Sequence, residues 1–202
     1  TIIDQCLKTL LRVDVISGFV IALSEKDTLF KSSLYFNHSK MLASAKGGRE
    51  RFHSVLNALN SLAKIAKPND WILVHDSVRP CVKKIDIEML INEVSNHQTG
   101  GILATGVVDT IKQVAIDGKV STIDRSKLFK AQTPQMFRYG VLKDALENVH
   151  GQLKNRGIAL EIQTGLPIVH VDRPRLIEVL QNLLDKLLLL LIIHLLLLLL
   201  LL

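Results

Sequence analysis

The sequence is poor in cysteine, and its two cysteines suggest no structural or metal-binding role. Cys6 and Cys81 are far apart and form neither a CxxC pair nor a cluster with histidine. They therefore predict neither a zinc site nor a disulfide framework, and they favour a reducing, cytoplasmic location. The first residues also lack a basic segment followed by an apolar run, so the sequence predicts no export signal.

Long basic runs and abundant aromatic residues are lacking as well. The net charge of +6 suits an anionic partner, but the basic residues are scattered, and no run is longer than Lys83 and Lys84. Aromatic residues make up only 4% of the chain. Because nucleic-acid-binding proteins use clustered charge and aromatic stacking surfaces, the sequence predicts no nucleic-acid partner and favours a phosphorylated small molecule.

What the chain does contain is an alternation of apolar strand patterns and amphipathic helix patterns. Short apolar runs predict buried strands at residues 18–23, 41–45, 71–75 and 102–105. Helical spacing of apolar residues predicts helices at residues 2–12, 50–66, 85–96 and 139–149. A chain of 202 residues suffices for one domain of this kind. The alternation predicts an α/β fold with a doubly wound, mostly parallel sheet.

A β-hairpin is predicted between residues 107–115 and 119–123. Both segments alternate apolar and polar residues, and Asp117 and Gly118 form the turn between them. An arm of this kind often serves as a dimer contact. An extended segment follows at 129–138, around Thr133.

Candidate catalytic residues follow the strongest strand, WILVH, directly. Asp76 comes immediately after it and Arg79 three residues later. Since ligands of open α/β sheets bind beyond the carboxyl ends of the strands, Asp76 is a candidate Mg²⁺ ligand and Arg79 a candidate phosphate-binding residue. The alternative is that Asp76 caps a turn and Arg79 only pairs with it. His75 is more typical of a hydrogen-bonded core histidine than of a base.

Weaker signals come from a glycine pair and from two polar residues downstream. Gly47 and Gly48 precede a predicted helix and could bring backbone N–H groups close to a phosphate, although such pairs also end strands for conformational reasons. Arg125 could bind phosphate and Thr133 could donate from its hydroxyl. Taken singly, Arg125 and Thr133 are more typical of surface residues.

Four segments in order carry a family resemblance across about residues 1–150: GGRERFHSVLNAL, WILVHDSVRPC, TGGILATGVVDTIK and TIDRSKLFKAQTPQMF. Together they resemble the 2-C-methyl-D-erythritol 4-phosphate cytidylyltransferases. Ribitol-5-phosphate cytidylyltransferases share HDxxRP and TPQ, but TGGILAT and DRSKLF fit the erythritol family better. The resemblance implies a Rossmann-like nucleotidyltransferase fold and a homodimer joined by the hairpin arm. It also implies Mg²⁺-dependent attack of methylerythritol phosphate on the α-phosphorus of CTP.

The resemblance further implies roles for individual residues. Asp76 matches the carboxylate that binds metal and substrate, and Arg79 matches a residue of the catalytic site. The other matches are Gly48, Ser54 and Ser77 for the nucleotide, and Thr110, Arg125 and Thr133 for the substrate. Arg125 is expected to reach the methylerythritol phosphate bound to the neighbouring subunit.

Both ends of the sequence depart from the family pattern. The family begins with a strand, a PAAGxGxRM-type loop and a lysine in a PKQ element, which surround the triphosphate; the 202 residues contain no such loop. Since nucleotidyl transfer depends on positioning and charge stabilisation, we expect impaired activity. A non-catalytic dimerising domain is therefore an alternative function.

The segments after residue 150 do not follow the pattern of the cytidylyltransferase family. Residues 158–185 resemble the start of a sensor histidine kinase ATP-binding domain, with Asn182 at a position that binds Mg²⁺-ATP, or else form an ordinary amphipathic helix. A histidine-kinase-related signalling fragment is thus another alternative. Residues 187–202 are Leu and Ile apart from His194. They are fewer than the ~20 needed to span a bilayer, so we expect a low-complexity tail outside the fold rather than a membrane anchor. The predicted divisions are 1–150, 151–186 and 187–202.

Overall fold

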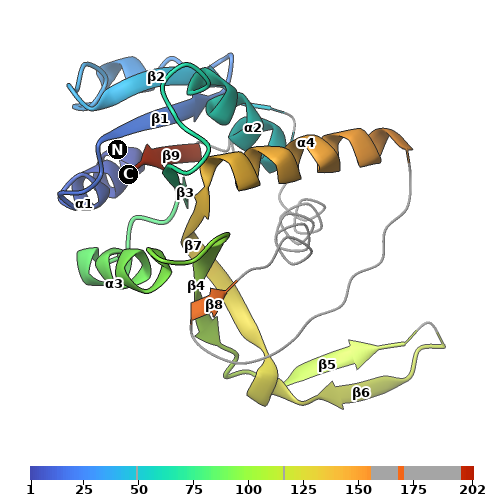
Figure 1. The fold of residues 1–202 in the computed structure, drawn as a ribbon. Helices are drawn as coiled ribbons and strands as arrows, with labels where there is room; N and C mark the ends of the chain where they lie inside the picture. The colour runs from blue at the N-terminus through green and yellow to red at the C-terminus, as the bar shows by residue number, and fades with distance from the viewer. Residues whose placement is uncertain (49, 116, 156–167, 171–196) are drawn as a thin grey trace.

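The computed structural model describes residues 1–202 except 49, 116, 156–167 and 171–196. Figure 1 shows a central sheet with helices on both sides and a two-stranded arm that projects away from it. The helices are α1 (Ile2–Leu10), α2 (Arg51–Ser61), α3 (Lys84–Val94) and α4 (Tyr139–Asn155), with short 3-10 turns η1 (Phe30–Ser32) and η2 (Arg125–Lys127). The strands are β1 (Gly18–Leu23), β2 (Met41–Lys46), β3 (Trp71–Asp76), β4 (Gly100–Gly106), β5 (Ile111–Val114), β6 (Val120–Ile123), β7 (Phe129–Arg138), β8 (Ile168–His170) and β9 (Leu197–Leu201).

The main sheet has the strand order β2-β1-β9-β3-β7-β4-β8. Strands β1 and β2 are parallel neighbours, and β3 and β4 run in the same direction as they do. Strands β7, β8 and β9 run the opposite way and lie between or beside them. The predicted α/β class is confirmed, with antiparallel strands interleaved among the strands of common direction.

Two apolar cores, one on each face of the sheet, make the fold doubly wound. On β1, Val20 packs on the side of α2 and α4, whereas Phe19 packs on the side of α1 and α3. On β3, Ile72 and Leu73 divide between the same two cores. Because successive side chains of a strand point to opposite faces, a strand covered by helices on both sides is apolar throughout, as GFVIAL is.

Strand β9 corrects, for residues 197–201, the prediction that the leucine-rich tail lies outside the fold; residues 187–196 lie outside the described residues. Its backbone pairs antiparallel with β1 on one side and with β3 on the other, in the middle of the sheet (Figure 1). The physical reason is that β1 and β3 would otherwise each present an unpaired row of N–H and C=O groups. A leucine strand can satisfy these groups and bury its side chains; Leu201 is 8% exposed.

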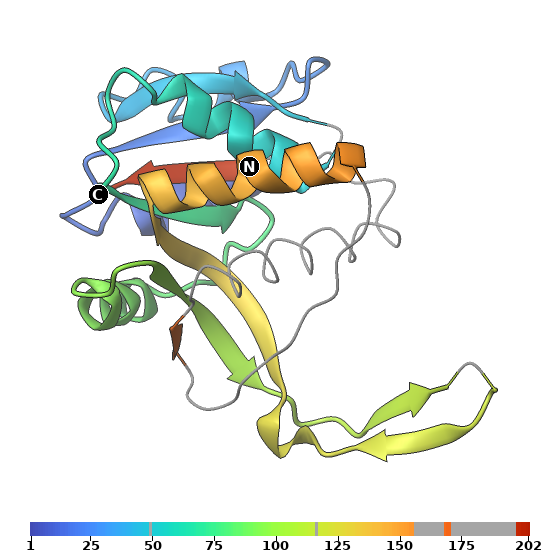
Figure 2. The same ribbon diagram turned by 45° about the vertical axis from the view of Figure 1, so that its right-hand side comes forward.

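The predicted β-hairpin is present as β5 and β6. The strands pair from Ile111 opposite Ile123 to Val114 opposite Val120. Figures 1 and 2 both show this pair extending beyond the ends of β4 and β7, away from the helices. Most of the segment predicted to resemble a histidine kinase, including Asn182, lies outside the described residues. Within the described part of the chain, no helix is both long and apolar enough to cross a membrane.

Candidate functional site

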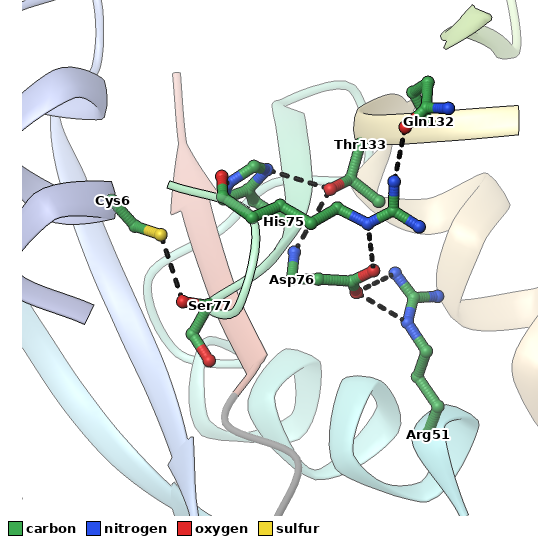
Figure 3. Close-up of polar contacts among 8 residues, drawn as sticks. Cys6, Arg51, His75, Asp76, Ser77, Gln132 and Thr133 are labelled. Atoms are coloured by element: carbon green, nitrogen blue, oxygen red, sulfur yellow. Dashed lines mark hydrogen bonds and ion pairs between the residues drawn. The ribbon is translucent and has the colours of Figure 1, made fainter. Parts of the chain in front are cut away.

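The polar residues of the site gather where β3 ends. Strand β3 is buried over most of its length, and its last residue, Asp76, is partly exposed. Figure 3 shows Arg51, His75, Asp76, Gln132 and Thr133 converging here from α2, β3 and β7. The structure thus places the predicted Asp76, Arg79 and Thr133 in one cluster.

Asp76 is held by two arginines, one on each carboxylate oxygen. Arg51 donates from Nε to Oδ1 at 2.9 Å, and its Nη2 lies 2.8 Å from the same oxygen. Arg79 donates from Nε to Oδ2 at 3.2 Å and from Nη1 to the amide oxygen of Gln132. The structure thus contains the Arg79–Asp76 pair of the alternative interpretation, and the expected roles of these residues towards metal and phosphate remain predictions.

The two arginines differ strongly in exposure. The side chain of Arg51 is 7% exposed, whereas that of Arg79 is 42% exposed. Among the described residues, the buried Nη1 of Arg51 has no hydrogen-bond partner, and its Nη2 has only the ion pair with Asp76. A buried guanidinium group with unused donors is costly, and a water molecule or an anion can satisfy such donors.

His75 and Thr133 form a second polar contact behind Asp76. His75 Nε2 lies 3.1 Å from the carbonyl oxygen of Arg79, so this nitrogen must donate a proton. Burial lowers the pKa of His75 to about 4, and the neutral ring leaves Nδ1 as an acceptor. Nδ1 therefore receives the hydroxyl proton of Thr133 at 3.0 Å, and Thr133 Oγ1 accepts the N–H of Asp76 at 3.3 Å.

This arrangement changes the expectation for Thr133. Its hydroxyl proton is given to His75, so in this arrangement it is not available to donate to a phosphate. The interpretation of His75 as a hydrogen-bonded core residue is confirmed, since it is fully buried and both ring nitrogens are used.

Gly48 and Ser54 lie together at the start of α2. The N–H of Gly48 donates to the hydroxyl oxygen of Ser54 at 2.9 Å, and Ser54 is 1% exposed. A Cβ added to Gly48 would lie 2.1 Å from the Cβ of His53, so only glycine fits this close approach. Of the other predicted nucleotide residues, Ser77 is buried, and its carbonyl oxygen accepts a hydrogen bond from Cys6.

Thr110 and Arg125 lie at the base of the hairpin arm rather than in the cluster. Both are exposed, and Arg125 donates to the backbone oxygen of Val108. In the part of the chain that the structure describes, no hydrogen bond or ion pair joins either residue to Asp76. The expectation that Arg125 acts on a neighbouring subunit remains a prediction.

Sequence reasoning missed Arg51 and Gln132. A signal for Arg51 was present, because it occupies the same buried helical face as Ser54, Val55 and Ala58 at spacings of three, four and seven residues. A charged residue on such a face requires a partner of opposite charge. No sequence pattern points to Gln132, because its contact with Arg79 joins positions that are 53 residues apart.

Asp76 is the residue of this cluster that would hold a magnesium ion, in place of one of its guanidinium partners. The described residues contain no group of three or more His, Cys, Asp or Glu side chains that could hold a metal ion. Mg²⁺, however, is commonly bound by one or two carboxylates together with substrate phosphates and water. A single carboxylate beside two guanidinium groups is therefore compatible with a Mg²⁺ that is bound together with substrate phosphates.

Comparison with known proteins identifies the relatives of the chain. Residues 1–164 match the model of the family described as "IspD: 2-C-methyl-D-erythritol 4-phosphate cytidylyltransferase". Two curated relatives with that enzyme name are each 56% identical, one from Vesicomyosocius okutanii over 149 residues and one from Ruthia magnifica over 146 residues. The matches cover 74% and 72% of this chain. The chain spans about three fifths of the length of these relatives, 62% and 61%.

Solved structures show the same relationship at the level of the fold. A crystal structure of a 4-diphosphocytidyl-2C-methyl-D-erythritol synthase is 30% identical, with a TM-score of 0.68, and the match covers 90% of this chain and 77% of that one. The family match spans most of the chain, including every residue of the cluster at the end of β3. This chain therefore belongs to the 2-C-methyl-D-erythritol 4-phosphate cytidylyltransferase family.

Proposed function

We propose that this chain takes part in the transfer of CMP from CTP to 2-C-methyl-D-erythritol 4-phosphate, with release of pyrophosphate. The observation that carries the proposal is the cluster at the end of β3. It combines one carboxylate with two guanidinium groups, where open α/β sheets bind their ligands. Such a set suits a reaction between two phosphorylated compounds.

In the proposed reaction, a phosphate oxygen of methylerythritol phosphate forms a bond to the α-phosphorus of CTP. The bond from that phosphorus to the oxygen bridging to the β-phosphate breaks, and pyrophosphate leaves with the electron pair. Asp76 would hold Mg²⁺, which supplies charge neutralisation for the phosphates. Arg79 would bind a phosphate oxygen, and Arg51 would keep the Asp76 carboxylate oriented.

The remaining predicted residues have proposed roles around this centre. Gly48, Ser54 and Ser77 would contact the nucleotide, because they lie at the start of α2 and directly after Asp76. Thr110 and Arg125 would act on methylerythritol phosphate at the base of the arm. For Arg125 we propose that the methylerythritol phosphate is bound by the partner subunit of a homodimer joined by β5 and β6. The free thiols of Cys6 and Cys81 support a cytosolic location.

The test is formation of CDP-methylerythritol and pyrophosphate from CTP, methylerythritol phosphate and Mg²⁺, followed by ³¹P NMR. Because the 202 residues contain no triphosphate-binding loop of the family type, the assay compares the chain alone with a protein in which such a segment precedes residue 1. We expect the chain alone to be slower by several powers of ten, since that loop supplies most of the charge stabilisation. Asp76→Asn should abolish the activity of the longer protein.

Ribitol 5-phosphate is the control substrate, and it should react poorly because the named relatives are methylerythritol phosphate enzymes. Equal rates with both substrates, or full activity in the Asp76→Asn protein, would contradict the proposal.

A further inference from the structure

The two ion pairs of Asp76 are unequal, and this inequality determines which one can open. Arg51 approaches Oδ1 with two nitrogens, at 2.9 and 2.8 Å, and its side chain is 7% exposed. Arg79 approaches Oδ2 with one nitrogen at 3.2 Å and is 42% exposed. Breaking a buried pair leaves an uncompensated charge, whereas an exposed pair contributes little. Arg79 can therefore leave Asp76 far more easily than Arg51.

The charge balance of the cluster opposes direct cation binding. With Arg79 in place, two positive guanidinium groups face one carboxylate, and each carboxylate oxygen has a cationic partner. A divalent cation approaching Asp76 meets an excess of positive charge, whereas an anion is attracted. The buried Nη1 of Arg51, which has no hydrogen-bond partner among the described residues, is a further donor that an anion can use.

We propose that Arg79 is an exchangeable partner of Asp76, which leaves Oδ2 for a phosphate oxygen and so opens that oxygen to a divalent cation. Arg51 stays on Oδ1 and keeps the carboxylate fixed. Gln132 holds the guanidinium group of Arg79 in the closed arrangement. Phosphate binding and cation binding at Asp76 are then coupled, because each is stronger when the other has occurred. The inference rests on the proposed function only in taking the anion to be a substrate phosphate.

Binding of Mn²⁺ alone tests the exchange without any turnover. Free Mn²⁺ is measured by electron paramagnetic resonance for the 202-residue chain and for Arg79→Gln, at constant ionic strength. The variant should bind Mn²⁺ roughly tenfold more tightly, because it removes both a competing partner and a like charge. Asp76→Asn combined with Arg79→Gln should lose this gain, which assigns the ion to Asp76.

Sulfate, as a probe for the phosphate oxygens, tests the coupling. Replacing chloride by sulfate should strengthen Mn²⁺ binding by the unmodified chain and have little effect on Arg79→Gln. Gln132→Ala should give a smaller gain in Mn²⁺ affinity than Arg79→Gln, since it only loosens Arg79. Unchanged or weaker Mn²⁺ binding in Arg79→Gln would overturn the proposal. Because no reaction is measured, these results stand whether or not the chain transfers CMP.

Discussion

At the scale of single residues, His75 shows how a buried polar group fixes its neighbours. Its ring receives the hydroxyl proton of Thr133 and donates to the backbone of Arg79, so it joins β7 to the turn that carries Arg79. Thr133 in turn accepts the N–H of Asp76. The neutral ring is a condition for this arrangement, because a second ring proton would oppose the hydroxyl proton of Thr133.

The neutral state of His75 predicts a pH dependence of stability. Burial lowers its pKa in the folded protein from 6.5 to about 4, so between these values only the unfolded chain binds the proton. The free energy of unfolding should therefore fall as pH decreases from 6.5 towards 4, with His75 contributing about 3 kcal/mol in total. Urea denaturation at several pH values measures the slope.

His75→Gln provides the comparison, because it should flatten the slope over this window whatever its effect on absolute stability. His38→Gln is the matched control, since His38 lies against the rings of Phe19 and Tyr35, away from Asp76. Equal slopes for the unmodified chain and His75→Gln would show that the histidine is not kept neutral.

At the scale of helices and strands, local patterns predicted most elements but not how the strands neighbour one another. Helices α1 to α4 and strands β1 to β7 all lie at or near predicted segments, because periodicity and turn residues are local signals. The insertion of β7 between β3 and β4 depends on pairings across long stretches of sequence, which no local pattern records. For the same reason, only part of the cluster at Asp76 could be predicted. The local pattern places Asp76 at a strand end, whereas its contact with Arg51 depends on how α2 packs.

Strand β9 is the element that the sequence pattern predicted least well. A run of leucine has no period, so it cannot distinguish a strand from a helix or a tail. Its place in the sheet is decided by β1 and β3, which pair with it from both sides. The same uniformity means that a shift of β9 by one residue presents identical side chains, so its register is weakly specified.

The central position of β9 predicts that it stabilises the fold. Leu199 lies opposite Val20 of β1 and Val74 of β3. Leu199→Pro should lower the free energy of unfolding by roughly 3 kcal/mol or more, because proline removes a donor from a central strand and leaves a buried carbonyl group unpaired. Leu199→Val, which keeps the backbone donor, should cost much less. Urea denaturation compares them, and equal midpoints for the proline variant and the unmodified chain would show that β9 contributes little.

At the scale of the whole molecule, the site and the arm lie at the same end of the sheet. Asp76 ends β3, and the arm continues from the carboxyl end of β4 into the start of β7. Figures 1 and 2 show the arm standing clear of the two helix-covered faces. A two-stranded ribbon has little stability alone, so contact with a second surface would stabilise an arm of this kind.

The last prediction concerns assembly through this arm. Val114 and Val120 lie opposite each other on β5 and β6 and are 66% and 62% exposed. If a second copy of the chain covers them, changing both to Lys should raise the dimer dissociation constant by at least about tenfold, because like charges would replace an apolar contact. Leu34→Lys is the matched control, since Leu34 is 86% exposed but lies outside the arm. Sedimentation velocity over a range of concentrations measures the shift, and an unmodified chain that stays monomeric at high concentration would contradict a dimer built on the arm.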